Sequence, residues 1–166
     1  MTAQDWVQKL DMKPHPEGGF YKETYRSVGS IPVEGLPATY GSERSYATGI
    51  YFLLDGENFS ALHRLKQDEM WHFYAGSRLL VHLIDSTGNY NQIQLGPDVD
   101  AGEVFQAVVP GGSYFGSEVQ DKSSFALVGC TVSPGFDFRD FEMPSAEELL
   151  AQYPEHESVI RRMTRH

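Results

Sequence analysis

The segment His63–Gly76, HRLKQDEMWHFYAG, limits the possible folds of this chain more than any other stretch. Polar and apolar residues alternate in it, as they do in strands that bury one face. A second marker, Pro110-Gly111-Gly112, lies further along the chain and predicts a turn into another strand. Polar side chains at strand ends beside such turns are typical of a small antiparallel barrel that encloses a pocket.

Similar patterns predict strands through most of the chain, and the 16 glycines and nine prolines favour many reversals. The expected strands cover residues 20–26, 47–54, 59–65, 69–74, 79–85, 89–95, 105–109, 114–118 and 125–132. Short helices are expected over 3–11, where Thr2 and Asp5 have the spacing of a capping box, and over 146–152 and 156–164. Residues 29–44 are expected to form a loop, and 134–143 a strand across a sheet edge or a dimer seam. We therefore expect one mainly β domain over residues 1–166, with a barrel core at about 19–143 and a helical arm at about 144–166.

Charge and cysteine content narrow the choice of partners and compartment. The formal net charge is −10 and the basic residues form no long run, which argues against nucleic acid or anionic membranes as partners. Cys130 is the single cysteine, so no intrachain disulfide forms, and its apolar neighbours predict a buried, inert thiol. Because the chain shows neither a signal peptide nor a membrane-length apolar run, we expect a cytoplasmic protein.

His63 and Glu69 are the strongest candidates for chemistry. Strand alternation places His63 on one face with Leu65, and Glu69 on one face with Trp71 and Phe73. If both faces look into the barrel, the imidazole and the carboxyl meet among aromatic side chains. Such surroundings raise the pKa of a carboxyl, while a neighbouring carboxylate orients a histidine and makes it more basic, so the pair could perform acid–base chemistry. The alternative is a structural hydrogen bond at a strand end.

Other candidates near the expected barrel mouth also have two interpretations each. His15 and Glu17 could bind a ligand, or could belong to a rigid turn in which glycines supply the positive φ angles. Arg64 could clamp an anion or form a surface ion pair. Gln106 could bond to a ligand or to backbone. Tyr114 could donate a proton or fill the barrel rim.

Aromatic residues could line the pocket. Trp71 and Phe115 are the candidates for a wall that faces a flat or sugar-like ligand, together with Phe73 and Phe105. Ordinary core packing is the other interpretation of all four side chains.

The sequence HRLKQDEMWHFYAG followed by PGG resembles the two motifs of the cupin superfamily. His63, Glu69 and Gly76 fall in register with the first motif, and Pro110 and Gly112 with the second. Metal-binding cupins hold their ion with three histidines and one glutamate, according to this resemblance.

The chain departs from that ligand set at two positions. Leu65 stands where the first motif has its second histidine, and Phe115 stands where the second motif has its histidine. Only His63 and Glu69 remain, and a tight site normally needs three protein ligands, so we expect no cofactor. A divalent metal on His63 and Glu69 is the alternative, if another side chain such as His72 or His82 were recruited.

One branch of the superfamily resembles nearly the whole chain. The five similar blocks are HPEGGFYKETYRS, ATGIYFLL, HRLKQDEMWHFYAG, VVPGGSYF and LVGCTVSPGFDFRDFEM. They identify the chain as a member of the small cupin-like family long catalogued as a domain of unknown function, the cupin-5 type. The resemblance implies a jelly-roll barrel, or double-stranded β-helix, and a homodimer, but no established activity. Family members have been compared with metal-free dTDP-4-keto-sugar 3,5-epimerases, which use a histidine base and a tyrosine acid.

We therefore expect a protein that binds a small carbohydrate-like or carbonyl ligand in the barrel. The first hypothesis is a metal-independent epimerase or isomerase, in which His63 is the base, Glu69 orients it and Tyr114 returns the proton. The second is a metal-dependent cupin oxygenase or isomerase. The third is a binding protein without turnover.

Overall fold

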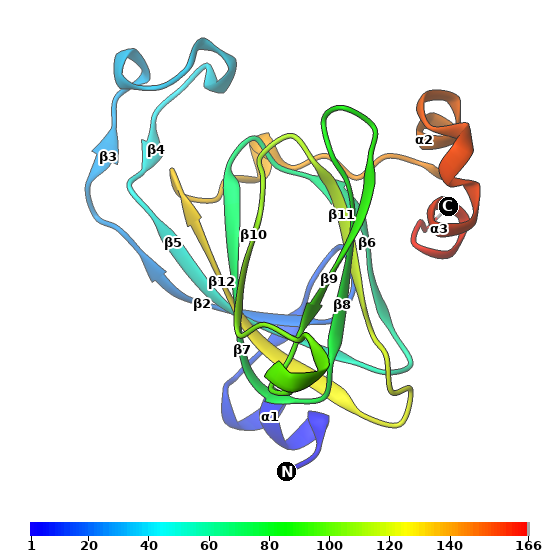
Figure 1. Cartoon of the computed structure of the whole chain (residues 1–166). Helices are drawn as coiled ribbons and strands as arrows, with labels where there is room; N and C mark the ends of the chain where they lie inside the picture. The colour runs from blue at the N-terminus through cyan, green and yellow to red at the C-terminus, as the bar shows by residue number, and fades with distance from the viewer. Residues whose placement is uncertain (166) are drawn as a thin grey trace.

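The fold is a barrel made from two antiparallel sheets that face each other (Figure 1). The computed structural model describes residues 1–165. The larger sheet contains, in spatial order, β1 (Lys13–Pro14), β2 (Phe20–Arg26), β5 (Thr48–Asp55), β12 (Phe125–Ser133), β7 (Asp68–Gly76) and β10 (Gln106–Val109). The smaller sheet contains β6 (Phe59–Arg64), β11 (Tyr114–Val119), β8 (Leu79–Ile84) and β9 (Tyr90–Leu95). Nine of the ten strands expected from the sequence are present within the described residues, and the mainly β jelly-roll class is confirmed.

Aromatic side chains from both sheets fill the space between them. Trp71 of β7 lies edge-on to Phe52 of β5 at 6.1 Å between ring centroids, and to Phe115 of β11 at 6.2 Å. All three rings are at most 2% exposed. Burying rings of this size supplies much of the hydrophobic stabilisation of the barrel.

Within residues 1–165, three short α-helices lie outside the barrel. Helix α1 (Ala3–Lys9) begins at the predicted capping box of Thr2 and Asp5. Helices α2 (Ala146–Gln152) and α3 (Glu157–Arg162) pack on the smaller sheet, with the 3₁₀ turn η5 (Pro154–His156) between them (Figure 1, right). None of the described helices is long and apolar enough to cross a bilayer.

A two-stranded arm projects from the end of the larger sheet (Figure 1, upper left). It consists of β3 (Ser30–Ile31), the 3₁₀ turns η1 (Val33–Gly35) and η2 (Ala38–Tyr40), and β4 (Arg44–Ser45). The residues between 29 and 44 therefore contain more regular structure than the expected loop. Two further 3₁₀ turns lie elsewhere, η3 (Val99–Ala101) and η4 (Phe138–Asp140).

The prediction of a strand over residues 134–143 is wrong. The chain forms η4 there, and the Asp137 side chain accepts a hydrogen bond from the backbone N–H of Arg139. A buried ion pair, in which Arg44 donates two hydrogen bonds of 2.8 Å to the Asp140 carboxylate, fastens this segment to the arm. Residues 134–143 thus cover one side of the barrel mouth, and Glu142 forms an isolated antiparallel bridge to Arg64 of β6.

Candidate functional site

A pocket of about 750 Å³ opens beside β1 and β2 and under the segment 134–143. Four of its titratable lining side chains are buried: Glu17, His63, Glu69 and Cys130. A cavity of this size, with aromatic walls and a few converging polar groups, is typical of a small-molecule site.

His63 lies on β6, and both of its ring nitrogens are engaged. Nε2 is 2.8 Å from Oε2 of Glu17, and Nδ1 is 2.7 Å from the carbonyl oxygen of Ala61. A carbonyl oxygen only accepts hydrogen bonds, so Nδ1 bears a proton. The ring is further held by Phe115, at 4.1 Å between centroids, and by Phe141, at 5.4 Å. Its orientation is therefore fixed from four sides.

The turn between β1 and β2 delivers Glu17 to His63. Gly18 and Gly19 have φ angles of 115° and 76°, in the region that favours glycine. A Cβ atom on Gly18 would lie 2.1 Å from the carbonyl oxygen of Phe59, so the turn can pack against β6 only without one. The backbone N–H of Ala61 also donates to the Glu17 carbonyl oxygen at 2.8 Å. Sequence and packing together hold this carboxylate beside the imidazole.

Glu17 and His63 form a charged pair in spite of their burial. Burial alone would raise the pKa of Glu17 and lower that of His63. The attraction and hydrogen bond between the two groups outweigh burial, so the pKa of Glu17 is lowered and that of His63 is raised. Both shifts thus favour the charged forms of the two groups, carboxylate and imidazolium.

The pKa of Glu69, on β7, is shifted in the opposite direction to that of Glu17. Burial and then the negative charge of Glu17 raise its pKa to about 7, and the positive charge of His63 only partly offsets them. Its neighbour Cys130 is a buried free thiol whose pKa is raised well above the usual value, chiefly by burial. The thiol therefore stays protonated, whereas Glu69 can change its protonation state near pH 7.

His15 lies next to Glu17 and is neutral. The backbone N–H of Glu17 donates to Nδ1 of His15 at 3.2 Å, and the imidazole is edge-on to Tyr21 at 4.7 Å between centroids. Burial lowers the pKa of His15 more than the nearby Glu17 carboxylate raises it. Since Nδ1 accepts a hydrogen bond, the single ring proton lies on Nε2.

Four of the residues singled out from the sequence thus meet in one pocket: His15, Glu17, His63 and Glu69. The expected pairing within this group needs correction, because the partner of His63 is Glu17 and not Glu69. Both ring nitrogens of His63 have hydrogen-bond partners in this arrangement, Ala61 and Glu17.

Tyr114 and Arg64 lie outside the pocket, which corrects their expected place. Neighbouring strand residues point to opposite faces, so while Phe115 contacts His63, Tyr114 packs on the C-terminal helices beside Tyr153. The Arg64 guanidinium lies 4.5 Å from the centre of the Tyr114 ring and pairs with Glu142.

Trp71, Phe115 and Gln106 do not line the pocket either. Both aromatic rings belong to the barrel core, with Phe115 supporting His63 from behind. Gln106 is exposed on the edge strand β10, where its amide is 3.3 Å from Nδ1 of His72.

The aromatic lining comes instead from residues that the sequence pattern did not single out for the pocket. These are Tyr21 of β2 and the phenylalanines of the segment over the mouth, Phe136, Phe138 and Phe141. The spacing in FDFRDF is a signal that could have found three of them, but it also fits a strand and so conceals their role.

The described side chains do not fit a cupin-type metal site. No group of three or more His, Cys, Asp or Glu residues within 1–165 is arranged to hold a metal ion. Both nitrogens of His63 have other partners. His72 is 3.0 Å from the Thr131 hydroxyl, and His82 bonds to Tyr90 and Glu118, so neither completes a ligand set with Glu69.

Comparison with known proteins gives consistent results. A family model described as "Cupin superfamily (DUF985)" matches residues 4–144. A solved structure of protein SO0799 from Shewanella oneidensis is 43% identical, with a TM-score of 0.89 over 99% of this chain and 98% of that one. A hypothetical protein from Leishmania major is 39% identical, with a TM-score of 0.92 over 100% of both chains.

A curated relative and a solved structure of lower identity also match this chain. The uncharacterized protein YML079W of Saccharomyces cerevisiae is 30% identical over 158 residues, covering 90% of this chain and 78% of the relative. A cupin 2 domain-containing protein from Halorhodospira halophila is 14% identical with a TM-score of 0.57, which supports the fold alone. The match over residues 4–144, on a barrel of this topology, shows that the chain belongs to the DUF985 family of the cupin superfamily.

Proposed function

We propose that this protein is a metal-independent acid–base enzyme that moves a proton at a carbon next to the carbonyl group of a small, carbohydrate-like molecule. The observation behind the proposal is that two buried carboxyls in one pocket have pKa values pushed in opposite directions. Glu17 is held ionised, whereas the pKa of Glu69 is raised to about 7. Carboxyl pairs separated in this way mark acid–base roles in enzymes.

Glu69 is the proton acceptor in this proposal. A base works best when its pKa lies near the working pH, because a useful fraction is then ionised while its affinity for a proton is still high. The ionised form of Glu69 would take the proton from the substrate carbon, which leaves an enolate.

The Glu17–His63 pair sets the basicity of Glu69. Burial acts first, and the Glu17 charge then adds to it more than the His63 charge subtracts. His63 thereby acts through Glu17, as a positioning residue whose imidazolium keeps that carboxylate ionised inside the protein. This role replaces direct proton abstraction by His63.

A hydroxyl group in the same pocket can complete the reaction. Tyr21 of β2 lines the pocket, and its ring contacts His15. Return of a proton from Tyr21 to the other face of the enolate would give epimerisation. If the carbon that loses the proton also bears a hydroxyl, the intermediate is an enediolate, and return of the proton from Glu69 to the former carbonyl carbon, with the hydroxyl proton passing to the other oxygen, would give isomerisation.

Exchange of carbon-bound hydrogen tests the proposal, because it reports proton removal whatever the product is. The protein is incubated in D₂O with a panel of small ketones, aldehydes and keto sugars, and loss of the proton next to the carbonyl is followed by NMR. We expect exchange with at least one compound, a rate that rises through pH 7, and loss of at least about 100-fold in Glu69→Gln.

Glu118→Gln is the matched control, because Glu118 is a partly buried glutamate with a histidine partner outside the pocket. It should exchange at the wild-type rate. Equal rates in wild type and Glu69→Gln would contradict the proposal. Binding of panel compounds with no exchange at all would favour a binding protein without turnover instead, and would appear as a rise in melting temperature alone.

A further inference from the structure

We infer that the ligand of this pocket is a carbonyl compound that also bears an anionic group, with His15 donating a hydrogen bond to the carbonyl oxygen and Lys13 pairing with the anion. This inference rests on the proposed function, because it names the substrate class of the same pocket. It follows from the bonding of His15 and from the balance of charges around the pocket.

The first argument is that His15 has one free donor. Its Nδ1 accepts the backbone N–H of Glu17, and an amide N–H can only donate, so the ring proton must be on Nε2. Nε2 makes no hydrogen bond within the described residues, yet it is not among their enclosed polar atoms without a partner.

The position of the ring says where this donor points. The His15 side chain is only 7% exposed, and it packs against Tyr21, Phe52 and Phe141. Because the ring lines the pocket, the small open part is the edge that a ligand meets. A neutral imidazole N–H in such a place is suited to a carbonyl oxygen on which negative charge develops, and it adds no charge that Glu69 would have to overcome.

The second argument is that one cationic side chain of the pocket lining has no ion-pair partner within residues 1–165. At the mouth, Lys22 pairs with Asp11 at 2.7 Å and Arg26 pairs with Glu23 at 2.7 Å. Asp137 pairs with Arg139, and deeper in the pocket Glu17 pairs with His63. Glu69 is largely uncharged below pH 7.

Lys13 is the remaining lining charge, and it has no ion pair within residues 1–165. Lys13 therefore presents a positive charge without an ion-pair partner at the pocket, although the whole chain has a net charge of −10. An unpaired lysine at the mouth of such a pocket favours a carboxylate or phosphate on the ligand.

The two groups are placed to act on one molecule. Lys13 and His15 are two residues apart at the end of β1, and both contact the Tyr21 ring, with Lys13 Nζ at 5.3 Å from its centroid and the His15 ring at 4.7 Å. A ligand lying along Tyr21 would meet the cation and the neutral donor at different points of its length.

Three small probes separate the two contacts. 4-Oxopentanoate has a ketone and a carboxylate, pentanoate has only the carboxylate, and pentan-2-one has only the ketone. Dissociation constants are measured by NMR titration of ¹⁵N-labelled protein. We expect millimolar binding of 4-oxopentanoate, about fivefold weaker binding of pentanoate, and about threefold weaker binding of pentan-2-one, as single exposed contacts would give. Dihydroxyacetone phosphate, set against dihydroxyacetone, tests whether phosphate is preferred over carboxylate as the anion.

Two variants of His15 distinguish ligand binding from a structural role. Asparagine can reproduce the Nδ1 acceptor, whereas glutamine can reproduce the Nε2 donor. We expect His15→Asn to melt within a few degrees of wild type but to bind 4-oxopentanoate and pentanoate equally. His15→Gln should retain the ketone preference. The reverse pattern, with ketone preference kept in His15→Asn and lost in His15→Gln, would show that His15 only shapes the turn and would overturn the inference.

Lys13→Met tests the anion contact, with Lys9→Met as control, since Lys9 is exposed on α1 away from the pocket. Only Lys13→Met should remove the preference for 4-oxopentanoate over pentan-2-one. Equal preference in both variants, or no binding of any probe by wild type, would overturn the inference. Glu69→Gln keeps these results separate from the proposed function, because it should still bind the probes while losing hydrogen exchange.

Discussion

Two histidine–glutamate pairs among the described residues have similar geometry, but the pKa values of their histidines are shifted in opposite directions. His63 lies 2.8 Å from Glu17, and His82 lies 3.0 Å from Glu118. Both histidines are at most 3% exposed, on strands that flank β11 in the same sheet. The pKa of His63 is nevertheless raised, while burial lowers the pKa of His82 more than Glu118 raises it.

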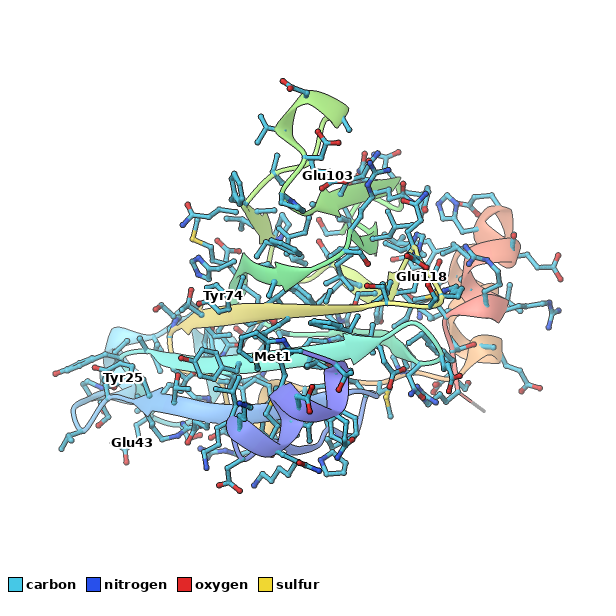
Figure 2. All side chains as sticks on the ribbon, turned by 90° about the horizontal axis from the view of Figure 1, so that it is seen from below. Met1, Tyr25, Glu43, Tyr74, Glu103 and Glu118 are labelled. Carbon is cyan, nitrogen blue, oxygen red and sulfur yellow. The ribbon has the colours of Figure 1, made fainter. Side chains whose placement is uncertain are left out.

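The difference lies in what else each glutamate touches. Glu118 lies beside the C-terminal helices (Figure 2), where Lys122 and Arg162 also bond to it at 2.9 and 3.0 Å. These cations help lower the pKa of Glu118 to about 2 despite burial, and they repel a further positive charge on His82. Within residues 1–165, no lysine or arginine pairs with Glu17, so its charge is left to stabilise His63. A buried carboxylate keeps a histidine charged only when no stronger cation shares it.

Glu17→Gln, which removes the carboxylate that pairs with His63, should have the largest effect on the difference between the two histidine–glutamate pairs. In Glu17→Gln the His63 imidazolium would be buried without its partner, so we expect a loss of roughly 3 kcal/mol at pH 6. The lowered pKa of Glu17 stabilises the fold above its unfolded value near 4.5, and the raised pKa of His63 does so below its unfolded value near 6.5. The loss should therefore be greatest between these pH values and should shrink as pH rises through the folded pKa of His63.

Urea unfolding at pH 6 and pH 9 measures this loss, and NMR titration follows the His63 ring. The pKa of His63 should fall in the variant, because burial is the largest influence on it and the Glu17 charge and hydrogen bond that oppose burial are removed. An unchanged His63 pKa would show that Glu17 is not what keeps the ring charged.

Glu69→Gln should change the free energy of unfolding by a similar amount to Glu17→Gln, but in the opposite direction. The pKa of Glu69 is raised from 4.5 to about 7, so ionisation costs the folded state stability that grows between those pH values. Glu69→Gln has no such cost. Its stability relative to wild type should rise by roughly 3 kcal/mol from pH 4.5 to above pH 7. Unfolding curves across this range check the prediction, and a constant difference would contradict a buried, titrating Glu69.

Glu118→Gln should cost less, about 1 kcal/mol at neutral pH, because water screens its cations. The lowered pKa of Glu118 gives stability that is present above pH 4.5 and is lost as pH falls toward 2. Thermal melts should thus differ from wild type at pH 7 and converge in acid. A loss as large as that of Glu17→Gln would remove the distinction between the two pairs.

The smallest effect is expected from Lys122→Ala. It removes one of the cations that repel positive charge on His82, so the His82 pKa should rise. Stability should change by less than about 0.5 kcal/mol, because the Lys122 side chain is 60% exposed. NMR titration of His82 is the measurement, and a fall in its pKa would contradict the proposed cause.

The strands and caps could be predicted from sequence because their signals are local. Alternation correctly places His63 and Glu69 on inward faces, and the Thr2–Asp5 spacing correctly gives the first helix. The partnership of Glu17 with His63 could not be found in this way. It depends on how a turn packs against a strand far along the chain, which no local pattern records.

Two errors have definite physical reasons. Tyr114 is predicted to lie in the pocket, but alternation allows only one of the neighbours Tyr114 and Phe115 to face His63, and that residue is Phe115. The alternating phenylalanines of FDFRDF imitate a strand, but Asp137 bonds to the local backbone and stabilises a 3₁₀ turn instead. In both places the residue pattern fits two local structures equally well, and a side-chain contact determines which of them forms.

The Arg44–Asp140 ion pair joins the projecting arm to the segment that bears three of the pocket's aromatic rings. Its side chains are 1% and 0% exposed, so separating them would break two hydrogen bonds between opposite charges inside the protein. The same ion pair therefore holds both the arm and the aromatic wall of the cavity. While the pair is intact, the wall can move outward only together with the arm. Residues that do not line the cavity thus help to determine its shape.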